Sequence, residues 1–159
     1  MKVNELKILS ELIKNSRRSD RELAKAVDVS QPTVSRMISV LEKEEIIKEY
    51  TIVPDFCKLG FQILAVTFLD VEKEFEFQKL QKTFQNILVI GRGLGLNYSH
   101  VIVSLHRDYT SYTDFENDLK QTNLLKARNS ANFLVDLKND HSLFSLSVLS
   151  ELLKNVKDS

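Results

Sequence analysis

Residues 19–44 read SDRELAKAVDVSQPTVSRMISVLEKE, and this stretch decides the fold of the N-terminal part of the chain. Ser19 and Glu22 have the spacing of a capping box, so a short helix is predicted over 20–27. Asp28-Val29-Ser30 is then a tight connection, and Ser30 is the cap of another helix that carries Pro32 in its first turn and runs to about Glu44. Two helices joined by so short a turn predict a helix-turn-helix.

A preceding helix is predicted from Val3 to Asn15, because apolar residues recur there at three- and four-residue spacing. The segment Ile46–Val53 reads as a strand, which either supplies the wing of a winged helix-turn-helix or leads the chain into the next domain. Three helices followed by a strand therefore account for the first 50 residues.

The remaining sequence alternates strand-like and helix-like segments in the order β-α-β-β-α-β, which is typical of a ferredoxin-like sandwich. The predicted fold class is α+β, with a winged helix-turn-helix domain over 1–50, a linker over 51–60 and a ferredoxin-like domain over 61–159. The predicted segments are strands at Phe61–Val71, Ile87–Leu94, Tyr98–His106 and Ala131–Lys138, and helices at Glu74–Gln85 and Thr110–Thr122.

A last amphipathic helix is predicted at about Ser142 to Val156, with a wide apolar stripe that includes Leu149 and Leu153. A stripe of this width must be buried. The sequence leaves two partners open, namely its own ferredoxin-like domain or a second subunit.

Composition excludes several classes of protein. The 159 residues contain 22 Lys plus Arg and 22 Asp plus Glu, so a nucleic-acid site must be local rather than spread over a polycationic surface. Residues 1–41 hold eight basic and five acidic residues, a local charge of +3. A lone cysteine, Cys57, excludes an internal disulfide framework. No apolar run is long enough for a membrane span and no signal peptide is apparent, so the expected location is the cytoplasm.

The third helix presents a hydrophilic face suited to the DNA major groove. With Val34, Ile38 and Leu41 turned toward the core, a helix of about 100° per residue carries its polar residues on the other side. Arginine pairs with guanine and glutamine with adenine, whereas serine and threonine contact bases or phosphates. We predict base readout by Gln31, Thr33 and Arg36, and phosphate or backbone contacts from Ser30, Ser39, Arg17 and Arg18.

Residues 6–51 together resemble the Lrp/AsnC (feast/famine) transcription regulators. The resemblance rests on Leu6–Asn15, Arg18–Lys25, Thr33–Ile38 and Ile46–Thr51, and it continues through Pro54–Phe61, which is similar to the family's linker. It implies a winged helix-turn-helix followed by a ferredoxin-like domain that dimerises, often assembles further and can bind amino acids. The expected partners are double-stranded DNA, a second copy in a homodimer or larger even assembly, and a small-molecule effector.

Two departures from the family pattern stand out. Glu45 occupies the place where the family has a glycine after the third helix. The effector region reads GRGLGLN over 91–97 without the family's acidic residues, which argues against an amino-acid ligand. We predict either a bulged hairpin or an effector loop there, with Gly91, Gly93, Gly95 and Asn97 as the candidate residues.

No cofactor or metal site is predicted. Three glycines two residues apart match neither a dinucleotide fingerprint nor a Walker loop. His100 and His106 are about 20 Å apart on an extended strand, too far to share a metal ion. The chain is therefore expected not to be an enzyme, although related haem-biosynthesis decarboxylases share this two-domain plan, and Tyr98 and His100 are the residues to consider for such chemistry. A partner-binding winged helix without DNA contact is the other alternative.

Overall fold

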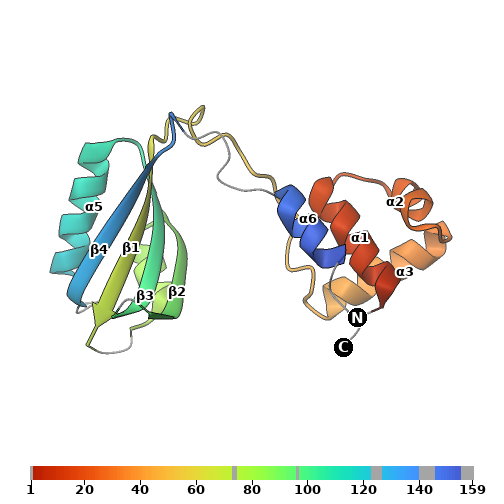
Figure 1. Cartoon of the computed structure of the whole chain (residues 1–159), viewed down its shortest axis with the longest axis horizontal. Helices are drawn as coiled ribbons and strands as arrows, with labels where there is room; N and C mark the ends of the chain where they lie inside the picture. Colours follow the sequence, from red (N-terminus) through yellow and green to blue (C-terminus); the bar gives the residue numbers. More distant parts are fainter. Residues whose placement is uncertain (1, 73–74, 96, 123–126, 140–145, 155–159) are drawn as a thin grey trace. The chain divides into compact units, whose positions relative to one another are not determined.

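The computed structural model describes residues 2–72, 75–95, 97–122, 127–139 and 146–154, which form two compact units. The helical unit comes from Met1–Val53 together with the C-terminal helix, and the sheet unit comes from Pro54–His141 (Figure 1). The helical unit contains α1 (Val3–Lys14), α2 (Asp20–Val27), α3 (Gln31–Lys43) and α6 (Leu146–Lys154). The sheet unit contains β1 (Ile63–Val71), α4 (Phe77–Thr83), β2 (Ile87–Gly95), β3 (Tyr98–His106), α5 (Tyr109–Gln121) and β4 (Ala127–Asp136).

The first three helices form the predicted helix-turn-helix, with bounds that differ from the predicted ones by a residue at most. The predicted capping box is present, since Glu22 N donates to Ser19 Oγ and Ser19 N donates to Glu22 Oε2. Asp28 joins α2 to α3 in the left-handed conformation, which aspartate tolerates better than most residues. The apolar faces meet in one core made of Ile8, Leu12, Leu23, Ala24, Val27, Val34 and Leu41.

The prediction of a strand at Ile46–Val53 is wrong, because these residues form no strand in the structure. The amides of Ile46 and Ile47 both donate to the carbonyl of Leu41 at the end of α3, so they are not available for a strand ladder. Tyr50 Oη donates to Glu42 Oε1 at 2.9 Å and ties the segment to α3. Burial, together with this bond, raises the pKa of Tyr50 to about 12, so the hydroxyl remains a donor.

Glu45 adopts the left-handed backbone conformation that a glycine would adopt at this turn. Its φ is 56°, its amide donates to Glu42 O, and the Ile46 amide donates to Leu41 O. These two bonds form a Schellman motif with Glu45 as the left-handed residue. A side chain with a Cβ is strained there, at a cost of roughly 1–2 kcal/mol.

We therefore expect Glu45→Gly to stabilise the helical unit by about 1 kcal/mol, because glycine adopts this conformation without strain. Urea unfolding of both proteins measures the difference. Glu44→Gly is the matched control, since Glu44 has a φ of −84° and glycine there only adds chain entropy. An equal response of the two variants would contradict the explanation.

The C-terminal helix α6 packs on α1, so it belongs to the helical unit (Figure 1). Ser10 and Ser150 are both buried at this contact, and Ser10 Oγ donates to Ser150 O at 3.0 Å. This partner differs from both alternatives left by the sequence, and the grouping differs from the expected division that assigned 61–159 to one domain. The small side chains of the two serines let α6 and α1 approach closely, which the apolar stripe did not indicate. Three apolar residues of α6 are exposed, namely Val148, Leu149 and Leu152.

The sheet unit confirms the predicted ferredoxin-like order. Its antiparallel sheet has the strand order β2-β3-β1-β4. Pairing with β1 extends β4 back to Ala127, four residues before its predicted start. The sequence did not indicate this part of the strand because Asn129 and Ser130 are polar and give no apolar alternation. The helix predicted at Glu74–Gln85 spans Phe77–Thr83 in the structure. Position 74, and positions 142–145, 155 and 156 of the predicted last helix, lie outside the described residues.

One face of the sheet packs against the helices and holds the core, which includes Leu69 and Ile102 from the strands, Leu80 from α4 and Phe115 from α5. Figure 1 shows α5 running along this side. Side chains alternate along a strand, so the neighbouring residues point to the opposite face. There the register places Val89, Val103, Val66 and Phe133 in one row across all four strands.

We name this row and its neighbours the open sheet face. Phe133 is 64% exposed and Val89 is 50% exposed, whereas Val66 and Val103 are half-buried. The adjoining row consists of Gly91, Val101, Phe68 and Ala131. An apolar surface that crosses a whole sheet is typical of an interaction site.

Candidate nucleic-acid interface

The hydrophilic side of α3 is exposed, as the sequence predicted. Val34 and Leu41 are fully buried, and Met37 and Ile38 pack against the same core. The opposite side carries Gln31, Arg36 and Ser39, all exposed. Ser35 adjoins them, is also exposed, and has a short side chain that favours close approach along this side. A helix with this arrangement can enter a major groove and meet base edges.

Ser30 and Thr33 form the N-terminal cap of α3. Thr33 N donates to Ser30 Oγ at 3.4 Å, and the two hydroxyl oxygens are 2.7 Å apart. The remaining amides of the first turn and the helix dipole favour an anion at this end. The cap therefore fixes the start of α3, and Thr33, which is half-buried, lies closer to the core than Gln31 or Arg36.

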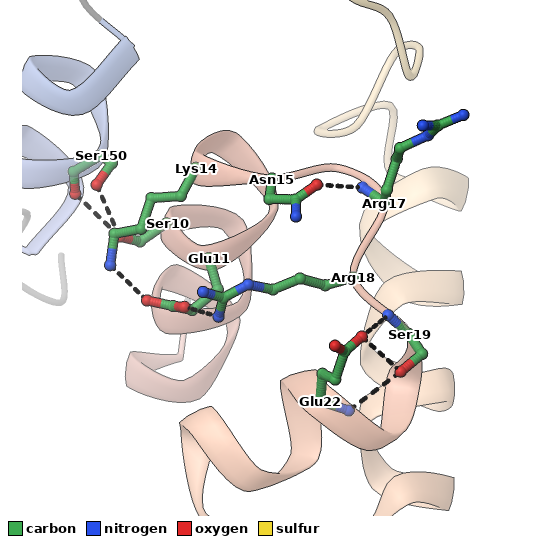
Figure 2. Close-up of polar contacts among 9 residues, drawn as sticks. All are labelled: Ser10, Glu11, Lys14, Asn15, Arg17, Arg18, Ser19, Glu22 and Ser150. Carbon is green, nitrogen blue, oxygen red and sulfur yellow. Dashed lines mark hydrogen bonds and ion pairs between the residues drawn. The ribbon is translucent and has the colours of Figure 1, made fainter.

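Arg17 and Arg18 are adjacent in the sequence but have different surroundings. The guanidinium of Arg18 contacts the carboxylate of Glu11 on α1, which also binds Lys14 (Figure 2). The hydrogen bond from Lys14 and then the charge of Arg18 lower the pKa of Glu11. The backbone amide of Arg17 donates to Asn15 Oδ1 at 3.0 Å, and its side chain extends away from the cluster (Figure 2).

Glu11 was not among the residues predicted for this region, although it holds one of them. The Glu11–Lys14 pair has the three-residue helical spacing that a sequence can indicate. The pair with Arg18 crosses the break after α1, and only the angle between α1 and the next segment brings the two residues together. Arg18 thus links α1 to the start of α2.

The candidate effector residues occupy the hairpin between β2 and β3. Gly91, Gly93 and Gly95 lie on β2, and Asn97 follows with a left-handed φ of 63°. Asparagine commonly adopts this conformation in tight hairpins, so the turn itself explains an asparagine at position 97. A Cβ at Gly91 would meet Val101 at 3.4 Å, whereas Gly93 and Gly95 have open space around them.

The two strand histidines are buried against aromatic rings. His100 lies against Phe75 and Phe77, with ring centroids 5.1 and 5.7 Å away. His106 Nε2 is 2.8 Å from Ser104 Oγ, and its Nδ1 is 3.3 Å from Asn86 Nδ2. Ser104 is fully buried, so a substrate has no access to its hydroxyl. Within the described parts of the chain, no group of three or more His, Cys, Asp or Glu residues gathers as a metal site would require.

Burial lowers the pKa of His106, and a hydrogen bond with the Ser111 backbone opposes this only in part. The unfolded chain takes up a proton near pH 6.5, whereas the folded chain does so at lower pH. Folding free energy from this group is therefore present above about pH 6.5 and lost as the pH falls below it.

We expect an NMR titration of the His106 ring to give a pKa below 6.5. His106→Gln should flatten the dependence of unfolding free energy on pH between 5 and 7.5. A ring that titrates at or above 6.5, with the same pH dependence in the variant, would refute the prediction.

None of the described helices has the length and apolar character that crossing a membrane requires.

Comparison with known proteins gives matches of sequence and of fold. A family described as winged helix-turn-helix DNA-binding matches residues 1–48. The HTH-type transcriptional regulator LrpC of Bacillus subtilis is 34% identical over 83 residues, which cover 52% of this chain and 57% of LrpC. The uncharacterized HTH-type transcriptional regulator PF2053 of Pyrococcus furiosus is 29% identical over 103 residues, which cover 62% of this chain and 70% of PF2053.

Solved structures match over more of the chain. The structure of Bacillus subtilis LrpC has a TM-score of 0.71 at 25% identity, covering 85% of this chain and 94% of that one. A complex of the transcriptional regulator NMB0573 of Neisseria meningitidis with L-Met has a TM-score of 0.76 at 18% identity, covering 94% and 99%. The fold of both units therefore recurs in these regulators, whereas the sequence matches to LrpC span little more than half of its length.

The helix-turn-helix, its exposed third helix and these relatives define a DNA-binding transcription regulator. In sequence and in fold the chain is similar to regulators of the Lrp/AsnC family, which agrees with the resemblance seen in the sequence.

Proposed function

We propose that this chain regulates transcription as a homodimer or larger even assembly that inserts α3 into the major groove of a specific operator. The exposed hydrophilic side of α3 carries the proposal, since Gln31 and Arg36 point away from a core that buries Val34 and Leu41. Arginine and glutamine are the side chains that distinguish guanine and adenine by paired hydrogen bonds. Thr33 completes the proposed base readout, and Ser30 and Ser39 contact phosphate or backbone.

The two arginines before α2 take different parts in this proposal. Arg17 is exposed with a free-standing side chain, which supports a phosphate contact. Arg18 is partly buried and engaged with Glu11, so its larger contribution is to hold the angle at which α2 leaves α1. Its phosphate contact, predicted from sequence, would compete with that ion pair.

Arg17→Ala is expected to weaken binding to all duplexes alike and to lower the slope of log affinity against log salt by about 1. Arg18→Ala is expected to change this slope less and to lower the unfolding temperature of the helical unit. Fluorescence anisotropy across a salt series and thermal unfolding separate the two effects. A larger slope change for Arg18→Ala would assign the phosphate contact to Arg18 instead.

The open sheet face supports self-association. A carboxylate-free apolar row from Val89 to Phe133 crosses four strands, and a two-fold axis would place the same row of a second copy against it. One helix-turn-helix makes few base contacts, and two copies on half-sites about 34 Å apart give useful specificity. Dimerisation therefore connects the sheet unit to the function of α3.

Selection of bound sequences from random duplex tests the proposal, with the protein's own upstream region as a control. We expect enrichment of a pseudo-palindrome with half-sites about one helical turn apart. Failure to bind bulk duplex even at low salt would favour a partner-binding module instead. An absorbance change with iron porphyrins would favour decarboxylase chemistry, whereas the proposal expects none because the chain acts as a regulator and not as an enzyme.

A further inference from the structure

A cleft of about 530 Å³ opens at the end of the sheet unit where β3 ends and α5 begins. This volume lies within the range of small-molecule sites. Three phenylalanines give it apolar walls, namely Phe61 before β1, Phe84 after α4 and Phe115 on α5. The candidate effector residues on the β2–β3 hairpin do not line it.

The charges around the cleft favour a cation. Asp114 and Asp118 lie one helical turn apart on α5, both exposed and both part of the lining. Arg107 is the cation among the lining residues, and its guanidinium lies 5.8 Å from the centre of the Phe61 ring. It also interacts with the carboxylate of Asp108. Burial lowers the pKa of His106, so this lining residue adds little positive charge at neutral pH.

The same end of the sheet is where the chain enters and leaves the sheet unit. Gln62 N donates to His106 O, and Leu137 N donates to Gln62 O, both at 2.9 Å. Phe61 directly precedes Gln62, whose backbone bonds to His106 and Leu137 hold the start of β1 beside the end of β4. A molecule that packs on Phe61 would act on the segment that joins this unit to the helix-turn-helix.

We infer that this cleft binds a small organic ammonium with an aromatic or aliphatic body. The ammonium pairs with Asp114 and Asp118, and the body packs on the apolar wall that Phe61, Phe84 and Phe115 line. The inference rests on the proposed function, because the ligand can act as an effector of DNA binding only if the chain regulates transcription. It adds the chemical class of that effector and a route from the cleft to the linker.

Chemical-shift titration of the full chain with phenethylammonium tests the binding directly, without DNA. We expect a dissociation constant of about 1 mM or below and shifts at Asn86 and Ser111. The anion 3-phenylpropionate has the same body without the amine and should not bind. L-Phenylalanine shows whether a carboxylate beside the ammonium is accepted through Arg107, and its binding supports the site as an amino-acid site.

The double variant Asp114→Asn/Asp118→Asn should weaken phenethylammonium binding about tenfold, since each exposed pair contributes up to about 1 kcal/mol. The control Glu72→Gln/Glu76→Gln removes the same charge outside the cleft lining and should leave binding unchanged. Undetectable binding at 10 mM, or equal loss in both double variants, would overturn the inference. Operator binding without ligand is measured separately, so its failure would concern α3 and not the cleft.

Limited trypsin digestion tests the connection to the linker. Lys58 is exposed in the turn just before Phe61, and cleavage there requires that turn to open. Phenethylammonium should slow cleavage at Lys58 severalfold in the parent protein and not in the Asp114→Asn/Asp118→Asn variant. If the rate of cleavage at Lys58 is the same with saturating phenethylammonium as without it, the link between cleft and linker is refuted.

Discussion

Phe133→Asp is expected to convert the proposed homodimer or larger assembly into monomers. Phe133 is 64% exposed on the edge strand β4, so the folded monomer tolerates the change. In an assembly built on the open sheet face, the new carboxylate would be buried without a partner next to Val66, at a cost of several kcal/mol. The dissociation constant of the dimer should rise by about 100-fold or more. Analytical ultracentrifugation over a concentration series measures it.

Val148→Asp is the matched control, because Val148 is 57% exposed and apolar but lies on α6. It should leave the assembly intact, and circular dichroism should show native folding of both variants. If Val148→Asp dissociates the assembly and Phe133→Asp does not, the copies associate through α6. Loss of the dimer should also reduce binding to a two-half-site operator, while binding to a single half-site remains weak but unchanged.

Arg36→Ala is expected to reduce affinity for the selected operator about 5- to 150-fold, which corresponds to roughly 1–3 kcal/mol. Arg36 is exposed on the side of α3 opposite to Val34, where a guanidinium can reach the edge of a guanine. The loss should be confined to operators that keep the contacted base pair. Repeating the selection with the variant should show relaxed preference at one position in each half-site.

Arg128→Ala removes the same charge from the sheet unit, where Arg128 pairs with Asp70, and it should leave the sequence preference unchanged. The assignment of base readout to Arg36 fails if its variant binds every duplex more weakly by the same factor. Such a result would make Arg36 a phosphate contact and would require a different rotation of α3 in the groove.

The helix-turn-helix was predictable because its determinants are local. The Ser19–Glu22 box, the Ser30 cap and Pro32 each act within one helical turn, so their meaning does not depend on the rest of the chain. The same applies to the exposed face of α3, which follows from the spacing of its buried residues. The segment Ile46–Val53 shows where this reasoning fails, since a strand depends on a partner ladder that local pattern does not supply.

The candidate site was predictable to a similar extent. Exposure of Gln31 and Arg36 follows from helical period, whereas the difference between Arg17 and Arg18 depends on where Glu11 lies after the chain turns. The cleft at Phe61 joins residues from a linker, a loop, a strand end and α5. No spacing in the sequence relates them, so only the folded sheet unit brings them together.

The sequence by itself determined the helices of the DNA-binding unit, their caps, the hydrophilic side of α3 and the β-α-β-β-α-β order, because propensity, capping and period act over a few residues. The tertiary structure alone decided that α6 packs on α1 through Ser10 and Ser150, and that Arg18 pairs with Glu11. It also decided that one row of apolar side chains crosses all four strands. These contacts join residues far apart in the chain, and their free energy depends on burial and register that form only when the units fold.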